Sequence, residues 1–154
     1  GDTFRGNAPF GDFVLRPGNH PVFFFATGTG IAPFRSMIRS RSFDLKNRNR
    51  VHLFFGARDA SEILYADEFE KLPNVDWRVA LSRPDSTWTG FRGRVTDLLR
   101  SLPRSAVPPD SQFYLCGSSA MIDEVKEILG VQGFPKEQIH QEVYYKVDPT
   151  EGSG

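Results

Sequence analysis

The apolar residues of this chain gather in short runs of strand length that alternate with segments of helical spacing. The first run covers residues 22–26, and further runs begin at Val51, Val75, Gln112 and Gln138. A strand that is apolar at successive positions is buried on both faces, whereas a half-exposed strand alternates polar and apolar residues. Between the runs, apolar residues recur at intervals of three and four, which is typical of amphipathic helices.

Helices are predicted at residues 32–42, 64–72, 95–102 and 120–129, with loops at 83–94 and 103–110. Ser118 and Ser119 are candidates for the N-cap of the last helix. Strands that alternate with helices pair in parallel through right-handed crossovers. The sequence therefore predicts an α/β fold of the Rossmann-like type, with a five-stranded parallel sheet and helices on both faces.

This α/β domain is predicted to cover residues 21–147. The preceding residues, 1–20, hold turn residues and a short extended piece that cannot form a sheet of its own. That piece is either an edge of the main domain or the remainder of an upstream unit. The polar tail at 148–154 is expected to be disordered or to derive from expression.

The first strand leads into Thr-Gly-Thr-Gly at residues 27–30 and then into a helical segment with Pro33 in its first turn. Proline fits there because its missing N–H would be unpaired in any case. Glycines let a phosphate approach the backbone, and the N–H groups of a first helical turn attract its charge. These residues alone leave nucleotide binding and a ligand-free turn both open.

Three more strand ends are expected beside this turn, because ligands of such sheets bind at the carboxyl ends of the strands. They are residues 56–58, 82–83 and 116–118. Glycine at three of the four strand ends indicates a ligand that needs room close to the backbone. Ser82 and Arg83 could bind a ribose phosphate or could be ordinary exposed loop residues.

Several classes of site do not fit the sequence. Pro33 stands where G-x-G-x-x-G would continue, and the second strand ends in Gly-Ala-Arg instead of an acid, so a standard Rossmann dehydrogenase is not expected. The chain lacks the P-loop Gly-Lys-Ser/Thr and the G-x-S-x-G elbow of serine hydrolases. Its three histidines have no metal-ligand spacing, and no metal site is expected.

The composition of the chain limits the classes of binding partner that are expected. Lys and Arg equal Asp and Glu at 19 each, so no overall field attracts nucleic acid or an anionic membrane. No apolar run is long enough for a membrane span, and the single cysteine fits a reducing compartment, so a cytoplasmic protein is expected. That cysteine, Cys116, is open to three interpretations: a redox nucleophile, an inert thiol, or a residue that faces the ligand, which its place at a strand end favours.

Five motifs follow one another along the chain: GTGIAPFRS at 28–36, FFGARDASEILYADEF at 54–69, ALSRPDSTWTGFRGRVTDLL at 80–99, YLCGSSAMIDEV at 114–125 and IHQEVYY at 139–145. In this order they resemble the nicotinamide-binding domain of the ferredoxin–NADP reductase family of flavoprotein reductases. The resemblance implies hydride transfer between NAD(P)H and a flavin.

The resemblance also implies roles for individual residues. Those implied to bind the nucleotide or the flavin are Thr27, Gly28, Thr29, Gly30, Pro33, Arg58, Ser82, Arg83, Gly117, Met121 and Tyr144. Among them, Ser82 and Arg83 match the place where the family contacts the adenosine ribose or its 2′-phosphate, and Tyr144 matches the aromatic residue against the flavin ring. Cys116 and Glu142 are implied to be catalytic residues beside the nicotinamide.

The cofactors and partners follow from the same resemblance. The pair Ser82-Arg83 resembles the corresponding residues of NADPH-using members of the family. The pattern Trp88-x-Gly90-x-x-Gly93-x-Val95 resembles that of NADH-using oxygenase reductases, and NADH is slightly favoured. The family's Arg-x-Tyr-Ser/Thr flavin motif is absent. FAD is therefore expected in a flavin-binding barrel whose truncated end and linker would be residues 1–20, and the fragment alone is expected to be inactive.

The full-length protein is expected to pass electrons to an iron–sulfur protein or a similar acceptor. Two other functions stay open: an isolated nucleotide-binding module without turnover of its own, and a non-redox α/β ligand-binding domain.

Overall fold

The computed structural model describes residue 15, residues 18–40 and residues 51–145, the last three by their backbone alone. Most of the predicted barrel remnant at 1–20, the end of the first predicted helix beyond residue 40, and the whole tail at 148–154 lie outside the described residues. The domain boundaries predicted from the sequence therefore stay predictions.

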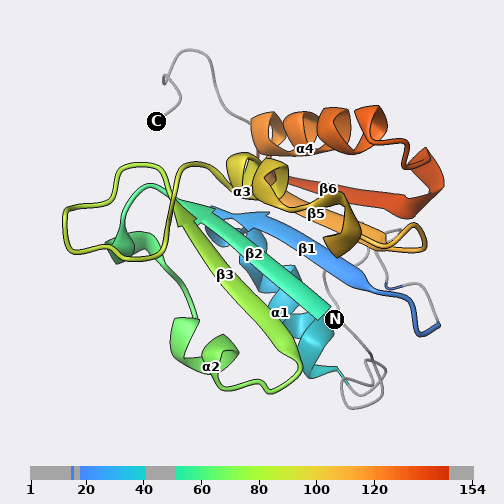
Figure 1. Cartoon of the computed structure of the whole chain (residues 1–154). Coiled ribbons are helices and arrows are strands. Elements are labelled where there is room, and N and C mark those ends of the chain that lie inside the picture. The colour runs from blue at the N-terminus through green and yellow to red at the C-terminus, as the bar shows by residue number, and fades with distance from the viewer. Residues whose placement is uncertain (1–14, 16–17, 41–50, 146–154) are drawn as a thin grey trace.

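Within the described residues, parallel strands form one six-stranded sheet in the order β4-β3-β2-β1-β5-β6 (Figure 1). The strands are β1 (Val22–Thr27), β2 (Val51–Ala57), β3 (Val75–Leu81), β4 (Phe91–Arg92), β5 (Gln112–Ser118) and β6 (Ile139–Tyr145). The predicted parallel α/β fold is confirmed, with one more strand than predicted. The additional strand, β4, lies in the predicted loop 83–94 and pairs with the last two residues of β3. Two residues are too few to produce an apolar run.

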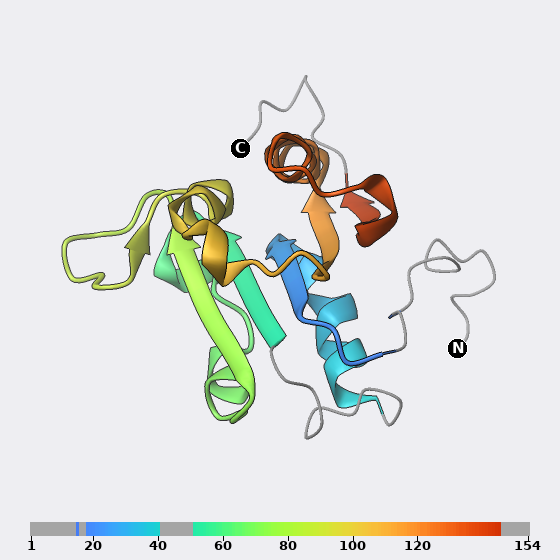
Figure 2. The same cartoon turned by 45° about the vertical axis from the view of Figure 1, so that its right-hand side comes forward.

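The helices cover both faces of the sheet, as predicted. They are α1 (Ile31–Arg39), α2 (Ala66–Glu70), α3 (Val95–Ser101) and α4 (Ser119–Val131), with short 3-10 turns η2 (Gly28–Gly30), η4 (Ala60–Glu62), η5 (Arg104–Ala106) and η6 (Lys136–Gln138). Figures 1 and 2 show α3 and α4 on one face and α1 on the other. The helix predicted at 64–72 is shorter than expected, because Tyr65 before it has a left-handed φ of 61° and Lys71 is already in a turn.

The central strand β1 divides its side chains between two apolar cores. Phe23 and Phe25 pack under α3 and α4, whereas Phe24 and Ala26 pack under α1 and α2. All four side chains are fully buried. Burial on both faces explains why the sequence is apolar at every position here instead of alternating.

Helix α4 ends in a Schellman motif. Gly133 has a φ of 96°, its N–H donates to Gly130 O, and Phe134 N–H donates to Leu129 O at 3.0 Å. A left-handed residue after the last turn satisfies the carbonyls that the helix leaves unpaired.

The strand order reverses at β1, since the chain first builds β2, β3 and β4 on one side and then returns to add β5 and β6 on the other. In open α/β sheets, ligands bind at the carboxyl ends of the strands beside such a point. Across the described residues, none of the helices combines the length and the apolar character that a membrane crossing requires.

Candidate nucleotide-binding site

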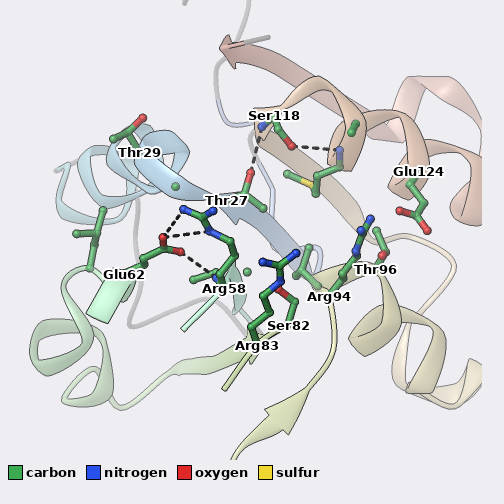
Figure 3. Close-up of a pocket in the computed structure, with 17 residues that line it drawn as sticks. Thr27, Thr29, Arg58, Glu62, Ser82, Arg83, Arg94, Thr96, Ser118 and Glu124 are labelled. Atoms are coloured by element: carbon green, nitrogen blue, oxygen red, sulfur yellow. Dashed lines mark hydrogen bonds and ion pairs between the residues drawn. The ribbon is translucent and has the colours of Figure 1, made fainter. Parts of the chain in front are cut away.

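A cavity of about 810 Å³ opens at the carboxyl ends of β1, β2, β3 and β5 (Figure 3). Its volume lies within the range of about 300–1,000 Å³ that is usual for cofactor sites. The residues of the cavity wall that the sequence predicted are Thr27, Gly28, Thr29, Gly56, Ala57, Arg58, Ser82, Arg83, Ser118 and Met121. The structure therefore brings together residues that are up to 94 positions apart, from Thr27 to Met121.

Further residues of the wall were not predicted as site residues. The polar ones are Glu62, Arg94, Thr96 and Glu124. Glu62 comes from the turn η4, Thr96 from the first turn of α3 and Glu124 from the second turn of α4. Their positions depend on how these turns and helices pack over the strand ends, which sequence periodicity does not report.

The ends of β1 and β5 are joined directly behind the cavity. Ser118 N–H donates a hydrogen bond of 3.0 Å to Thr27 Oγ1 (Figure 3). Gly117 has a φ of 149°, and a Cβ there would overlap Thr27 Oγ1. A Cβ at Gly30 would overlap the carbonyl oxygen of Cys116. These two glycines allow the close approach of two chain segments instead of making room for a ligand, and neither lines the cavity.

Cys116 lies in the apolar core under α1 and not on the cavity wall. The reason is the alternation of β5, whose preceding residue Leu115 faces α3 and α4. Burial raises the pKa of the Cys116 thiol to about 12, and the charge of Glu142, its register partner on β6, adds to the shift. The thiol is therefore protonated at neutral pH, which speaks against a thiolate nucleophile.

Other predicted site residues also lie off the cavity wall. Pro33 is in the first turn of α1, as expected, where its missing N–H costs no hydrogen bond. Glu142 is half-buried on β6, and the backbone of Tyr144 continues that strand. The side chain of Tyr144 lies outside the described part, so its predicted contact with a flavin stays a prediction.

The predicted cap of α4 is confirmed. Ser118 Oγ accepts a hydrogen bond from Met121 N–H at 3.3 Å. The first turn of α4 therefore begins at the cavity, with Met121 as an apolar part of its wall.

The cavity is rich in arginine. Arg58 is bound to Glu62, with an Nη2–Oε2 distance of 2.9 Å, and this pair lowers the pKa of the Glu62 carboxyl. Glu124 is likewise bound, to Arg100, at 3.0 Å. Among the described residues, no carboxylate lies within ion-pair distance of Arg83 or Arg94. The carboxylates of the wall are thus paired, and two guanidinium groups are available to an anion.

The backbone holds the arginine-bearing loops together. Arg83 N–H donates to Arg58 O at 2.7 Å and Ser82 N–H donates to Ala57 O at 3.0 Å, which extends the pairing of β2 and β3 past their ends. Val95, at the start of α3, packs on Gly56 so closely that a Cβ there would lie 3.1 Å from Val95 Cβ. In the described part of the chain, no group of three His, Cys, Asp or Glu side chains could hold a metal ion.

A cleft at the reversal point of a parallel sheet, with helix N-termini and unpaired arginines around it, defines an α/β domain suited to a phosphate-bearing nucleotide. Residues 24–127 match the sequence profile of the oxidoreductase NAD-binding domain, and the chain belongs to this family. The predicted relationship to ferredoxin–NADP reductases is confirmed. The volume and the cationic wall fit the phosphates of a dinucleotide.

Two relatives show how far the similarity extends. The chain is 36% identical over 156 residues to ferredoxin–NADP reductase B of Sorangium cellulosum, covering 94% of this chain and 63% of that protein. It is 33% identical over 147 residues to a component of the Na⁺-translocating NADH-quinone reductase of Methylococcus capsulatus, covering 90% of this chain and 36% of that protein. The chain therefore spans less than two thirds of these relatives.

Solved structures share the fold. A ferredoxin–NADP⁺ reductase from Neisseria gonorrhoeae, with bound FAD and NADP, has a TM-score of 0.73 at 21% identity, covering 84% of this chain and 58% of that one. The Amycolatopsis cytochrome P450 reductase GcoB has a TM-score of 0.73 at 24% identity, covering 87% of this chain and 41% of that one.

Proposed function

We propose that the chain binds NAD(P)H and presents the nicotinamide to a flavin held by another domain of a larger reductase. The observation that carries this proposal is the division of the cavity wall. Arg58 and Arg83 follow the ends of β2 and β3 and Arg94 directly precedes α3, whereas the β5 side carries Met121 and the Thr27–Ser118 junction. Phosphates would bind on the first side and the neutral nicotinamide on the second.

The residues of the chain would bind and orient the nucleotide and would not act as general acids or bases. Gly28, with a φ of 55°, leaves the backbone at the end of β1 open to a pyrophosphate. When bound, the nicotinamide supplies the hydride and the flavin accepts it. We propose an iron–sulfur protein or a similar one-electron carrier as the subsequent acceptor.

Calorimetric titration of the 154-residue chain with NADH and with NADPH tests nucleotide binding directly. Arg83→Ala is expected to weaken NADPH binding about tenfold, which corresponds to the loss of one charge-assisted hydrogen bond. Arg39→Ala removes an exposed arginine outside the cavity and is expected to change neither affinity. Absence of heat with both nucleotides would reject the proposal.

Flavin content tests whether this chain acts alone. The purified chain is expected to lack flavin absorbance and to oxidise no NAD(P)H while still binding it. Turnover by the chain alone would contradict the assignment of the flavin to another domain.

We further propose that Cys116 and Glu142 affect the reaction by fixing the turn at the end of β5, residues 116–118, beside the nicotinamide. In the full-length reductase, Cys116→Ala should slow hydride transfer more than it weakens nucleotide binding. Stopped-flow flavin reduction at an unchanged rate would reject this role.

A further inference from the structure

The side chains of Arg58 and Glu62 close a small ring at the end of β2 (Figure 3). Glu62 Oε1 accepts the backbone N–H of Arg58 at 2.9 Å, and Oε2 accepts Nε at 3.3 Å and Nη2 at 2.9 Å. Glu62 stands on η4, whose start is held by Asp59 Oδ1 accepting the N–H of Ser61 at 3.0 Å. The turn therefore sets the carboxylate against the strand end.

In G-x-G-x-x-G dinucleotide-binding sheets, the end of the second strand contacts the adenosine ribose. In this chain that strand end adjoins Ser82 and Arg83, since Arg83 N–H donates to Arg58 O at 2.7 Å. An acid there accepts hydrogen bonds from the ribose hydroxyls and disfavours a 2′-phosphate, whereas an arginine there accommodates that phosphate. In sequence this chain has only Arg58 at the strand end. In the structure it has both groups, because η4 returns Glu62 to the same place.

The pairing removes Arg58 as a free cation. Two lone pairs of Oε2 and one of Oε1 are used by Arg58, which leaves Oε1 able to accept one more hydrogen bond. Glu62 lines the cavity and its side chain is 37% exposed, so a ribose hydroxyl can reach it. A 2′-phosphate at that place would meet the carboxylate instead.

We propose that Glu62 is a specificity-determining residue that makes the pocket favour an adenosine ribose with a free 2′-hydroxyl, as in NADH, over a 2′-phosphorylated one. This inference rests on the proposed binding of NAD(P)H. Glu62 acts in two ways: it occupies Arg58, and it places a negative charge where the 2′-phosphate would lie.

The test is calorimetric titration of wild type, Glu62→Gln and Glu62→Asp with 5′-AMP, 2′-phospho-AMP, NADH and NADPH. Glu62→Gln frees Arg58 and removes the repulsion, so the ratio of the two dissociation constants in each pair should move at least about fivefold toward the 2′-phosphorylated ligand. Glu62→Asp retains the charge and should keep the wild-type preference. Thermal unfolding of each variant checks that the fold is intact.

Glu68→Gln is the matched control, because it removes the same charge from a carboxylate that binds Arg35 at 2.8 Å outside the cavity. Its ratio should stay within about twofold of wild type. An unchanged ratio in Glu62→Gln, or an equal shift in Glu68→Gln, would overturn the inference while leaving nucleotide binding in place. Failure of the wild type to bind either nicotinamide nucleotide would overturn the proposed function together with this inference.

Discussion

Replacing Gly117 by alanine is expected to be among the most destabilising single-methyl changes in the chain. Gly117 combines a φ of 149° with direct contact to the end of β1. Its added Cβ would overlap Thr27 Oγ1 and would lie 2.9 Å from Thr27 N and 3.1 Å from Thr27 O. The flexible hydroxyl can move aside, but the backbone of a central strand cannot.

The magnitude follows from two contributions. A non-glycine residue in this backbone region costs about 1–3 kcal/mol. Separating β1 from β5 to admit a methyl group costs about 1–3 kcal/mol more, as in other overpacked cores. The total of about 2–6 kcal/mol is a large part of the roughly 5–15 kcal/mol by which domains are usually stable.

Two other glycines separate these contributions. The Cβ that Gly133→Ala adds would have no atom within 4 Å, but residue 133 has a φ of 96°. This variant therefore measures backbone strain alone, which should destabilise the fold by about 1–2 kcal/mol. The Cβ that Gly130→Ala adds would also have no atom within 4 Å, and residue 130 lies inside α4, where alanine is favoured over glycine. This variant should therefore stabilise the fold by about 0.5–1 kcal/mol.

Urea unfolding followed by circular dichroism measures all three variants. The order of midpoints should be Gly130→Ala, wild type, Gly133→Ala and then Gly117→Ala, with similar m values. A Gly117→Ala variant no less stable than Gly133→Ala would show that β1 and β5 do not touch as described, and would refute the reasoning.

Three further predictions concern a buried thiol, a half-buried carboxylate and a buried hydroxyl. The Cys116 thiol, fully buried and with a pKa of about 12, should not react with iodoacetamide at about pH 8 until the chain is unfolded; labelling of the native chain, read by mass spectrometry, would contradict its burial. The hydrogen bond from His52 lowers the pKa of Asp76, so this carboxylate stabilises the fold above about pH 4 and the contribution is lost as pH falls through the lowered pKa. Asp76→Asn should flatten the acid limb of the pH–stability curve, and an unchanged limb would count against that bond. Thr96 is 2% exposed and its hydroxyl has no hydrogen-bond partner in the described structure, so Thr96→Val should leave the urea midpoint unchanged or raise stability by up to about 1 kcal/mol; a clear loss would mean that the hydroxyl is paired.

The main elements of the fold could be predicted because burial restricts which residues a strand can carry. Strand β1 is apolar at consecutive positions since helices cover both its faces, and this alone separates a central parallel strand from an edge strand. Strand β4 could not be found in the same way. It is held by pairing with Ala80 and Leu81 and by the Gly93 N–H, which donates to Leu81 O at 2.8 Å, and not by an apolar pattern.

The site could be predicted where it consists of strand ends and not where it consists of turns. Thr27, Arg58 and Ser82 follow directly from the rule that parallel strands end at one edge. Glu62 does not, because its place depends on the backbone path of η4, which brings its carboxylate back to the end of β2. A search of the sequence for an acid at the strand end therefore finds Gly-Ala-Arg and misses the carboxylate.

Residues 116–118 illustrate how one motif can meet three separate requirements. Cys116 fills the core beneath α1, Gly117 admits the end of β1, and Ser118 both donates to Thr27 and caps α4. Each requirement is set by packing around the cavity and would hold even if no residue of the motif touched a ligand. The reductase-like motif at 116–118 therefore predicts the backbone conformation of this turn, whether or not its residues contact a ligand. Because Thr27 and Ser118 line the cavity, the shape of this turn sets part of its wall, and Gly117→Ala should impair nucleotide binding even in the fraction of molecules that remain folded.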